Sequence, residues 1–261
     1  MGFRDCHVQT VFSDGKDTPE AVAEAAYRRG FNALGFSDHG HTGFDLSYCM
    51  PRERYPEYRA RIRALKEAYA GKMDVFCGIE QDGFSEEPTD GFDYVIGSLH
   101  YLKLGGEYIE VDWSADILKA AAEQHFGGDI LSVTECYFET LTERILPMKP
   151  DVVGHFDLIS KFNEGSALFP ESDERYRKAW KKAADALLTL GVPFEVNTGA
   201  ISRGYRTEPY PSAEMISYLS ERGGTFILSS DSHGKDTVGY GFAEQSGWSL
   251  TWSGWRPEKN R

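Results

Sequence analysis

The chain has 261 residues, of which 41% are hydrophobic, and its formal net charge at pH 7 is −13. This length suits one large barrel domain or two small domains, and the negative charge disfavours nucleic acid and anionic membranes as partners. The apolar runs are too short to cross a membrane, and the N-terminus, MGFRDCHVQT, contains no apolar signal region. We therefore expect a cytoplasmic protein with one domain over residues 1–261, present as a monomer or a small homo-oligomer.

Short apolar segments alternate with segments of helical character along the chain. Strands are expected near residues 3–8, 32–38, 74–80, 93–99, 151–156, 193–197 and 226–230. Helices are expected at residues 18–29, 52–70, 114–126, 129–146, 172–190 and 211–222, with a further one near 235–240. Glycines that favour a left-handed helix cap follow four of these helices, at Gly30, Gly71, Gly191 and Gly223.

This alternation predicts an α/β fold of right-handed βα units around a parallel sheet. The chain length favours a closed barrel with one strand fewer than the eight-stranded form. An open, doubly wound sheet is the alternative, but no GxGxxG or GxxxxGK[ST] motif follows any predicted strand. Four widely spaced cysteines without a CxxC pair are expected to stay reduced, with Cys6 and Cys77 buried in apolar strands.

Polar side chains, many of them able to bind a metal ion, follow the predicted strands. They are His7, Gln9 and Asp14 after the first strand, Asp38, His39 and His41 after the second, Glu80 after the third, His100, His155 and Asn197 after the next three, and Asp231 and His233 after the last. Six of the seven histidines occupy such positions, and only His125 does not. Because the carboxyl ends of parallel barrel strands meet at one face, where active sites are built, we expect these side chains to converge.

The residue types in this set indicate transition-metal chemistry. Neutral imidazoles and carboxylates suit Zn²⁺, Mn²⁺ or Fe²⁺. His7 and Gln9 are two residues apart, as are Asp231 and His233, so each pair projects to one side of an extended strand. Nine candidate ligands are too many for a single ion, so we expect two or three divalent ions that share bridging carboxylates.

In their order along the chain, these residues resemble the motifs of the PHP (polymerase and histidinol phosphatase) family. The first motif of that family reads roughly HxHxxxSDG and appears here as HVQTVFSDG, residues 7–15. A T/S-D-H motif follows at residues 37–39, then GIE at Glu80, GSLH at His100, GHFD at His155 and DSH at residues 231–233. The segments GHFDLISKFN (154–163) and EVNTGAISRGYRTEPYPS (195–212) look most like the histidinol-phosphate phosphatases of the family.

The resemblance implies a distorted seven-stranded (β/α) barrel with a trinuclear metal site. Carried over by position, the ligands are His7, Gln9, Glu80 and Asp231 for a first metal, Asp14, His39 and His233 for a second, and Glu80, His100 and His155 for a third. The chain departs from the family at Gln9, where the family usually has histidine. An amide oxygen is a harder ligand than imidazole and holds Zn²⁺ less firmly, so the first metal is expected to bind more weakly.

The implied reaction is hydrolysis of L-histidinol phosphate, a step of histidine biosynthesis, through attack by a hydroxide that bridges two metals. Residues expected to take part in catalysis are Glu80, Asp231, His233 and His41. Residues expected to bind phosphate or substrate are Arg203, with Arg206 as its substitute, Lys161, His41 and Asn197.

Three alternatives to this reaction stay open. The substrate is another small phosphate ester, such as a nucleotide or a phosphotyrosine, or the chain is a polymerase-associated proofreading domain, or it is an inactive metal-binding module. The charge of −13 and the lack of a basic aromatic groove disfavour the proofreading domain. Gln9 is the one feature that favours the inactive module.

A few residues outside the ligand set also carry expectations. Asp38 is expected to orient an imidazole rather than to bind metal. Asp157 is a candidate for binding the substrate amine or for capping a helix. Tyr205 and Tyr210 are expected to line a substrate pocket, and the segment WSLTWSGW (248–255) is expected to pack against the barrel.

Overall fold

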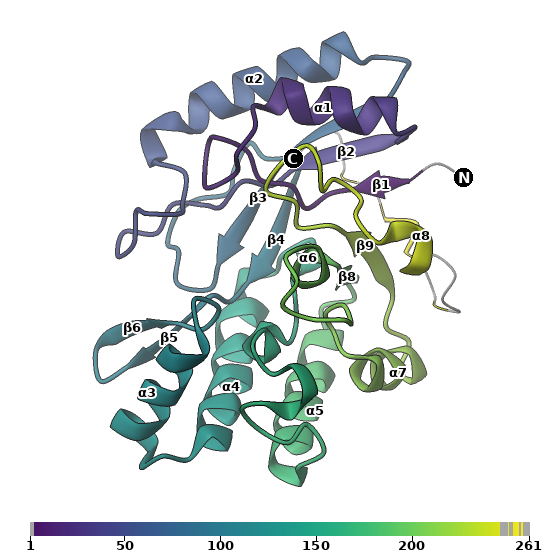
Figure 1. The fold of residues 1–261 in the computed structure, drawn as a ribbon. Helices are drawn as coiled ribbons and strands as arrows, with labels where there is room; N and C mark the ends of the chain where they lie inside the picture. The colour runs from purple at the N-terminus through teal and green to yellow at the C-terminus, as the bar shows by residue number, and fades with distance from the viewer. Residues whose placement is uncertain (1–2, 246–249, 251–252, 256, 258–261) are drawn as a thin grey trace.

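The strands of the computed structural model form one large parallel sheet and one small hairpin. The structure describes residues 3–245, 250, 253–255 and 257. The strands of the large sheet are β1 (Arg4–Asp5), β2 (Ala33–Phe36), β3 (Asp74–Asp82), β4 (Tyr94–Ser98), β7 (Val152–Val153), β8 (Phe194–Asn197) and β9 (Phe226–Ser229). They lie side by side in this order, and every adjacent pair is parallel (Figure 1).

The large sheet is almost closed into a barrel where its first and last strands meet. Beyond the end of β1, Val8 pairs in parallel with Ser232, which follows β9. The Gln9 backbone N–H donates to the Ser232 carbonyl at 2.8 Å, and the Ser232 N–H donates to the His7 carbonyl at 3.3 Å. The predicted seven-stranded α/β barrel is therefore confirmed, and its closure brings the segment that carries His7 beside the segment that carries Asp231.

Helices cover the outside of the sheet. The longer ones and the turn that precedes α2 are α1 (Pro19–Arg28), η1 (Arg52–Arg54), α2 (Tyr55–Ala68), α3 (Ala115–Phe126), α4 (Ile130–Met148), α5 (Glu174–Leu188) and α7 (Ala213–Glu221). Helices α1 and α2 lie together on one flank, and α3, α4 and α5 lie on the opposite flank (Figure 1). Shorter helical turns are η2 (Leu158–Ser160), η3 (Glu164–Ser166), α6 (Gly199–Ser202) and α8 (Phe242–Gln245). Within the described ranges, no helix combines the length and the apolar character needed to cross a membrane.

The ends of α1 follow the signals in the sequence. The Thr18 side chain accepts a hydrogen bond from the Ala21 N–H, and Pro19 occupies the first helical position, where a missing N–H costs nothing. After the helix, Gly30 takes a φ of 78°, a left-handed conformation that glycine adopts without a Cβ clash. The chain thereby turns directly into β2.

Tyr94 fills the barrel interior near the amino ends of the strands. It is fully buried in a cluster to which most of the barrel strands contribute. A Cβ atom at Gly35 or Gly78 would collide with the Tyr94 side chain, so these positions on neighbouring strands accept only glycine. The Tyr94 hydroxyl donates to the carbonyls of Cys6 at 2.6 Å and Phe36 at 3.1 Å. The ring therefore closes one end of the barrel and ties its first two strands together.

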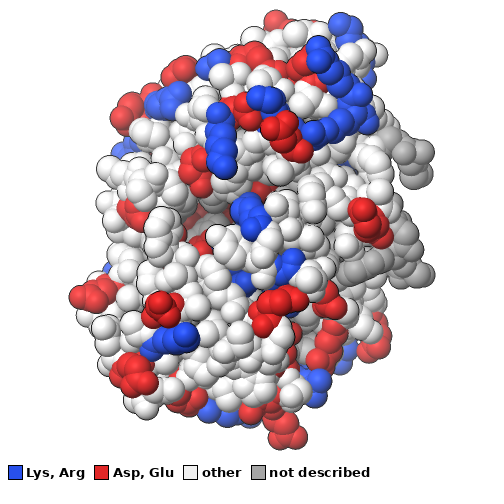
Figure 2. Space-filling model, in the orientation of Figure 1, with Lys and Arg blue, Asp and Glu red and all other residues white. Residues whose placement is uncertain are grey.

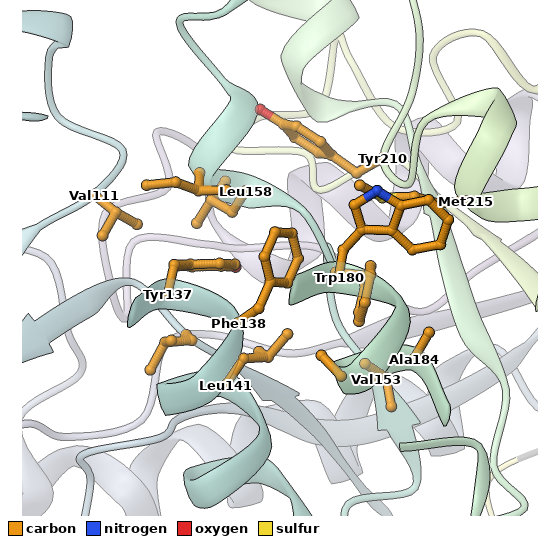
Figure 3. Packing of buried hydrophobic residues seen from close by; sticks show 14 of the residues in the cluster. Val111, Tyr137, Phe138, Leu141, Val153, Leu158, Trp180, Ala184, Tyr210 and Met215 are labelled. Atoms are coloured by element: carbon orange, nitrogen blue, oxygen red, sulfur yellow. The ribbon is translucent and has the colours of Figure 1, made fainter. Parts of the chain in front are cut away.

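A larger core lies between the sheet and helices α4, α5 and α7. Phe138 from α4, Trp180 from α5 and Met215 from α7 belong to one buried cluster with Val153 of β7 (Figure 3). Burial of side chains of this size stabilises the fold by roughly 1.5–3 kcal/mol each. This core anchors α5 and α7, and the loops that precede these two helices contribute Lys161 and Arg203 to the candidate site.

The hairpin of β5 (Tyr101–Leu104) and β6 (Glu107–Glu110) is absent from the sequence prediction. A turn signal is present in the sequence, since Gly105 and Gly106 separate the short runs YLKL and EYIE. Both glycines take positive φ angles, 58° and 93°, as a tight hairpin turn requires. The hairpin places Glu110 and the residues after it at the rim of the site.

Two predictions near the carboxyl terminus have different outcomes. The helix predicted at residues 235–240 is wrong, because that segment forms turns and the chain becomes helical only at α8. Gly239 and Gly241, with φ angles of 68° and 73°, interrupt the helical path there. In the segment 248–255, Trp255 packs edge-on against Tyr94 with 5.6 Å between ring centroids, while Trp248 and Trp252 lie outside the described residues.

Replacement of Tyr94 with phenylalanine tests its role in closing the barrel. We expect the free energy of unfolding to fall by about 1–3 kcal/mol, because two buried carbonyls lose a donor. Urea denaturation followed by circular dichroism measures the change. The matched control is Tyr108→Phe, whose hydroxyl accepts from Lys103 at the surface and whose effect should stay within about 0.5 kcal/mol. Equal unfolding midpoints for the two variants would contradict the role given to Tyr94.

Candidate metal centre

Glu80 lies at the centre of the site, near the carboxyl end of β3. Side chains alternate along a strand, and Phe76 and Gly78 face the barrel interior, so Glu80 points inward as well. Only 1% of Glu80 is exposed. A carboxylate buried to this degree is costly unless cationic or hydrogen-bonding groups compensate its charge.

Four imidazoles, from four different strand ends, surround the Glu80 carboxylate. Glu80 Oε2 lies 2.9 Å from His7 Nε2 and 3.0 Å from His39 Nδ1. Glu80 Oε1 lies 3.0 Å from His155 Nε2 and 3.4 Å from His100 Nε2. The two oxygens of one carboxylate thus face two different pairs of histidines, which is the arrangement needed for a bridging ligand.

Two further carboxylates complete the cluster. Asp14 lies 3.2 Å from His233 Nε2 and 3.7 Å from His39 Nε2, through its two different oxygens. Asp231 Oδ1 lies 3.6 Å from His7 Nε2 and 3.8 Å from His233 Nδ1. The ligand atoms offered by Asp14, His39 and His233 are all within 4.8 Å of one another, close enough to share one ion.

The cluster fits divalent cations on chemical grounds. His7 Nε2 and Gln9 Oε1 are buried polar atoms without a hydrogen-bond partner among the described residues, although His7 Nε2 is only 2.9 Å from Glu80. Burial raises the pKa of Glu80, but the charges of His7, His39 and His100 outweigh it and hold this pKa well below its usual range. An ionised carboxylate among imidazole nitrogens is a donor set for Zn²⁺, Mn²⁺ or Fe²⁺.

Gln9 belongs to this cluster. It is fully buried, and its Nε2 donates to Glu80 Oε2 at 2.9 Å, the oxygen that His7 also approaches. His7 and Gln9 therefore project to the same side of the chain, as their spacing predicts. The structure thus brings all nine ligand candidates of the sequence analysis into one group.

Two carboxylates that the sequence analysis misses contact His7 and His100 through the ring nitrogen that faces away from Glu80. Glu195 Oε1 lies 2.6 Å from His7 Nδ1, and Glu195 Oε2 accepts from the His155 backbone N–H at 3.0 Å. Asp82 Oδ2 lies 3.2 Å from His100 Nδ1. Such contacts fix the orientation and tautomer of a metal-binding histidine. A sequence signal exists for Asp82 alone, which is two residues beyond Glu80 on the same strand.

Arg203 and Asp231 form a tight unit at the edge of the cluster. Arg203 donates to the Asp231 carboxylate at 3.0 Å through Nη2 and to the Asp231 carbonyl at 2.9 Å through Nη1. Asp231 has a φ of 48°, uncommon for a residue with a side chain. A Cβ at Gly199 would lie 2.7 Å from Arg203 Nη2, so glycine is needed where α6 begins. This unit leaves Asp231 Oδ1 facing the histidines.

A cavity of about 390 Å³ opens onto the cluster. Besides Arg203 and members of the metal cluster, its wall contains Ser47, Tyr48, Tyr101, Glu110, Asp112, Trp113, Leu158, Lys161 and Tyr205. Lys161 Nζ is held by Asp112, 2.7 Å from its carbonyl and 3.0 Å from its carboxylate. Figure 2 shows a hollow on this face with acidic atoms inside it and basic atoms at its edge. A small anion that enters would meet both Lys161 and Arg203.

Two predicted substrate residues lie outside the lining of this cavity. Asn197 is fully buried, and its carbonyl oxygen Oδ1 accepts from the Gly199 N–H at 2.9 Å while its amide donates to Glu195 at 3.3 Å. These contacts make Asn197 part of the framework of the loop after β8 rather than of the cavity wall. The His41 backbone N–H donates to the Tyr55 hydroxyl at 2.7 Å, and its carbonyl accepts from Ser85.

Three residues of the neighbouring loops also point elsewhere. Arg206 is buried and donates to the Ser160 carbonyl at 2.7 Å, so it holds the loop after β7. Asp157 is fully buried and accepts from the Ser212 N–H, and burial raises its pKa to about 6 against the opposing charge of Arg206. Tyr210 is fully buried as well, whereas Tyr205 lines the cavity as predicted.

Asp38 has a different role from the predicted one. Its carboxylate accepts from the backbone N–H groups of Thr10 and Ser13 and from both of their hydroxyls, at 2.7–3.1 Å. It therefore organises the loop that carries Asp14 rather than orienting an imidazole. The bond between Ser13 and Asp38 thus joins the serine of the first motif to the aspartate of the second.

Comparison with known proteins agrees with this geometry. A family model described as "PHP domain" matches residues 5–199. The chain belongs to the PHP domain family. It is 31% identical over 257 residues to a protein of Deinococcus radiodurans named "Probable histidinol-phosphatase", covering 93% of this chain and 91% of that protein.

Two further relatives extend the likeness within this family. The histidinol-phosphatase of Bacillus subtilis is 26% identical over 266 residues, covering 93% of this chain and 97% of that protein. The histidinol phosphate phosphatase of Lactococcus lactis, solved with zinc, L-histidinol and phosphate, superposes with a TM-score of 0.67 at 19% identity, covering 98% of this chain and 99% of that one. The solved structure shows that this PHP chain shares its fold.

Replacement of Glu195 with glutamine tests whether the outer carboxylates support metal binding. The change keeps the shape but removes the charge opposite His7 Nδ1. We expect the affinity for one divalent ion to fall by about 10- to 100-fold, as for other outer carboxylates, measured by competition with a chelating dye. Glu107→Gln, on the exposed hairpin, is the control. An unchanged affinity in Glu195→Gln would show that His7 needs no such support.

Proposed function

We propose that this protein is a metal-dependent phosphatase that hydrolyses L-histidinol phosphate to L-histidinol and phosphate. The observation that carries the proposal is the buried Glu80 carboxylate among four imidazoles, beside a cavity with two cationic side chains. The names of the Deinococcus and Bacillus relatives, and the ligands of the Lactococcus protein, support the substrate. This activity, together with four free thiols, also supports a cytoplasmic location.

Two to three divalent ions, zinc, manganese or iron, belong to this proposal. One ion would be held by His7, Gln9, Glu80 and Asp231, a second by Asp14, His39 and His233, and a third by Glu80, His100 and His155. Bound there, such ions supply a nucleophilic water of lowered pKa and offset the charge of the phosphoryl group.

The side chains of this chain bind and orient the phosphate. Arg203 is pinned by Asp231 and Lys161 is pinned by Asp112, so both cations enter the reaction already in place. Fixed donors aimed at developing charge are worth more than mobile ones, because they need no reorganisation. His41 is left out of this proposal because it does not line the cavity.

The cavity also suits the rest of the substrate. Glu110 offers a carboxylate for an ammonium group, and Tyr48, Tyr101 and Trp113 offer rings for an imidazole, whereas the Asp112 carboxylate is already paired with Lys161. Burial raises the pKa of Glu110 to about 7, with the charges of Asp112 and Asp45 adding to the effect. A cationic ligand would favour the ionised form of this group. Glu110 therefore takes the role of binding the substrate amine, for which Asp157 was a candidate from the sequence.

Alanine substitution of the two cations tests the phosphate site. Arg203→Ala should lower kcat/KM by about 2–3 kcal/mol in transition-state terms, and Lys161→Ala by a similar or somewhat smaller amount. Arg222→Ala and Lys119→Ala, at exposed salt bridges, are the matched controls. Metal content measured in parallel separates lost phosphate contact from a disturbed Asp231. Kinetics like those of the controls would remove both residues from the site.

A substrate panel tests the leaving group. Histidinol phosphate should show a kcat/KM at least about tenfold above p-nitrophenyl phosphate, mononucleotides and phosphotyrosine, a gap of about 1.4 kcal/mol. Phosphate release with added Mn²⁺ or Zn²⁺ is the measurement. A generic ester that matches histidinol phosphate would leave a phosphatase with another substrate. No phosphate release from any ester would leave the inactive metal-binding module.

A further inference from the structure

We propose that the three ion positions of this centre are unequal, and that the ion beside Gln9 is the most weakly held and the most readily replaced by Mn²⁺. The inference rests on the metal centre of the proposed function and extends it to the individual positions. It predicts that the protein loses one zinc ion well before the others and works as a mixed-metal enzyme when manganese is present.

The donor atoms differ between the positions. Beside Gln9, His7 is the imidazole assigned to the ion, and its Nδ1 is already engaged by Glu195 at 2.6 Å, so only Nε2 is left for an ion. His39 also reaches Glu80 Oε2, through Nδ1 at 3.0 Å, but its other nitrogen, Nε2, faces Asp14 at 3.7 Å and is assigned to the second ion. The remaining donors there are the oxygens of Gln9, Glu80 and Asp231. By contrast, His39 and His233 flank Asp14, while His100 and His155 flank Glu80 Oε1. Each of these two positions therefore has two imidazoles.

Gln9 cannot leave its place beside His7. Its backbone N–H is part of the barrel closure through Ser232, and its side chain is fully buried. The chain from Thr10 onward folds back over it so closely that a Cβ at Gly15 would lie 2.6 Å from the Gln9 carbonyl. A side chain confined in this way faces the cluster whether or not an ion is bound.

One of the two polar atoms of the Gln9 amide lacks a partner in the described part of the chain. Its Nε2 donates to Glu80 Oε2 at 2.9 Å, while its buried Oε1 accepts no hydrogen bond from any described residue. A half-turn of the amide exchanges these nearly isosteric groups and presents Oε1 to the Glu80 side. In the observed orientation, the Gln9 amide donates to the Glu80 carboxylate and so occupies one of its lone pairs. In the turned orientation, the amide offers a neutral oxygen to the ion. Neither state supplies a second nitrogen.

The two kinds of donor atom favour different metal ions. Imidazole suits zinc, whereas carboxylate and carbonyl oxygens suit manganese and magnesium. The position beside Gln9, with one nitrogen and otherwise oxygens, therefore discriminates less strongly for zinc than its neighbours. Zinc bound there should exchange first, and an excess of Mn²⁺ should refill it.

The test compares four forms of the full-length protein, each loaded with zinc. They are the wild type, Gln9→His, Gln9→Met and the control Gln81→His, which changes a buried glutamine next to Glu80 whose amide donates to Ser85 and Glu87 instead. Each form is dialysed against a graded series of a zinc chelator, and bound zinc is counted by plasma mass spectrometry. Added Mn²⁺ is followed by its electron paramagnetic resonance spectrum, and thermal unfolding checks that each variant is folded.

The wild type and Gln81→His should release one zinc at a chelator concentration at least about tenfold below that needed for the rest, and should then bind Mn²⁺. Gln9→His should need at least about tenfold more chelator for the first release, and Gln9→Met no more than the wild type. Release of all ions together by the wild type, or a first release in Gln9→His at the wild-type concentration, would overturn the inference. If Gln9→His does not fold, the inference is overturned instead when Gln9→Met needs more chelator than the wild type for its first zinc release.

These readouts do not depend on turnover. A labile ion in a protein that hydrolyses no phosphate ester would refute the proposed function and leave the inference standing. Conversely, an active phosphatase whose zinc ions are equally held would refute only the inference.

Discussion

The structure depends on the compensation of one buried negative charge. The Glu80 carboxylate is almost wholly removed from solvent, and a carboxylate in such a place destabilises the fold unless cations surround it. Four imidazoles approach it at 2.9–3.4 Å, each from a different segment of the chain. Without Glu80, the four imidazoles would have no shared carboxylate. Because they approach both of its oxygens, the same carboxylate is placed to bridge metal ions.

The barrel explains how residues so distant in sequence reach one point. Parallel strands present their carboxyl ends at one face, and closure through Val8 and Ser232 brings the last strand beside the first. Tyr94 and the apolar cluster around it fill the interior next to the polar cluster, with the Tyr94 hydroxyl on the carbonyl of Cys6, so the barrel is a packed core. Arg203 and Lys161 come from the loops after β8 and β7, pinned to aspartates before a substrate enters.

Much of this arrangement is predictable because strand ends have a strong signal. The sequence places a histidine or an acid after nearly every apolar strand, and the parallel topology brings these strand ends together at one face of the barrel. Glu195 and Asp82 escape prediction because each is one more acid in an acidic chain, and only the fold shows which imidazole it meets. Asp157 was a candidate for the substrate amine because it lies two residues beyond His155. In the structure His155 faces the site, whereas Asp157 is buried under the loop that contains Arg206. The hairpin of β5 and β6 carries a readable turn signal at Gly105 and Gly106.

The central claim is that Glu80 bridges metal ions, and a crystal structure of the zinc-loaded protein with anomalous scattering at the zinc edge tests it most directly. The account predicts at least two ions within about 4 Å of each other, as in other multinuclear hydrolytic sites, with one Glu80 oxygen toward each. His100 and His155 should coordinate one of them. A single isolated ion at full occupancy, or ions that leave His100 and His155 without contact, would contradict it.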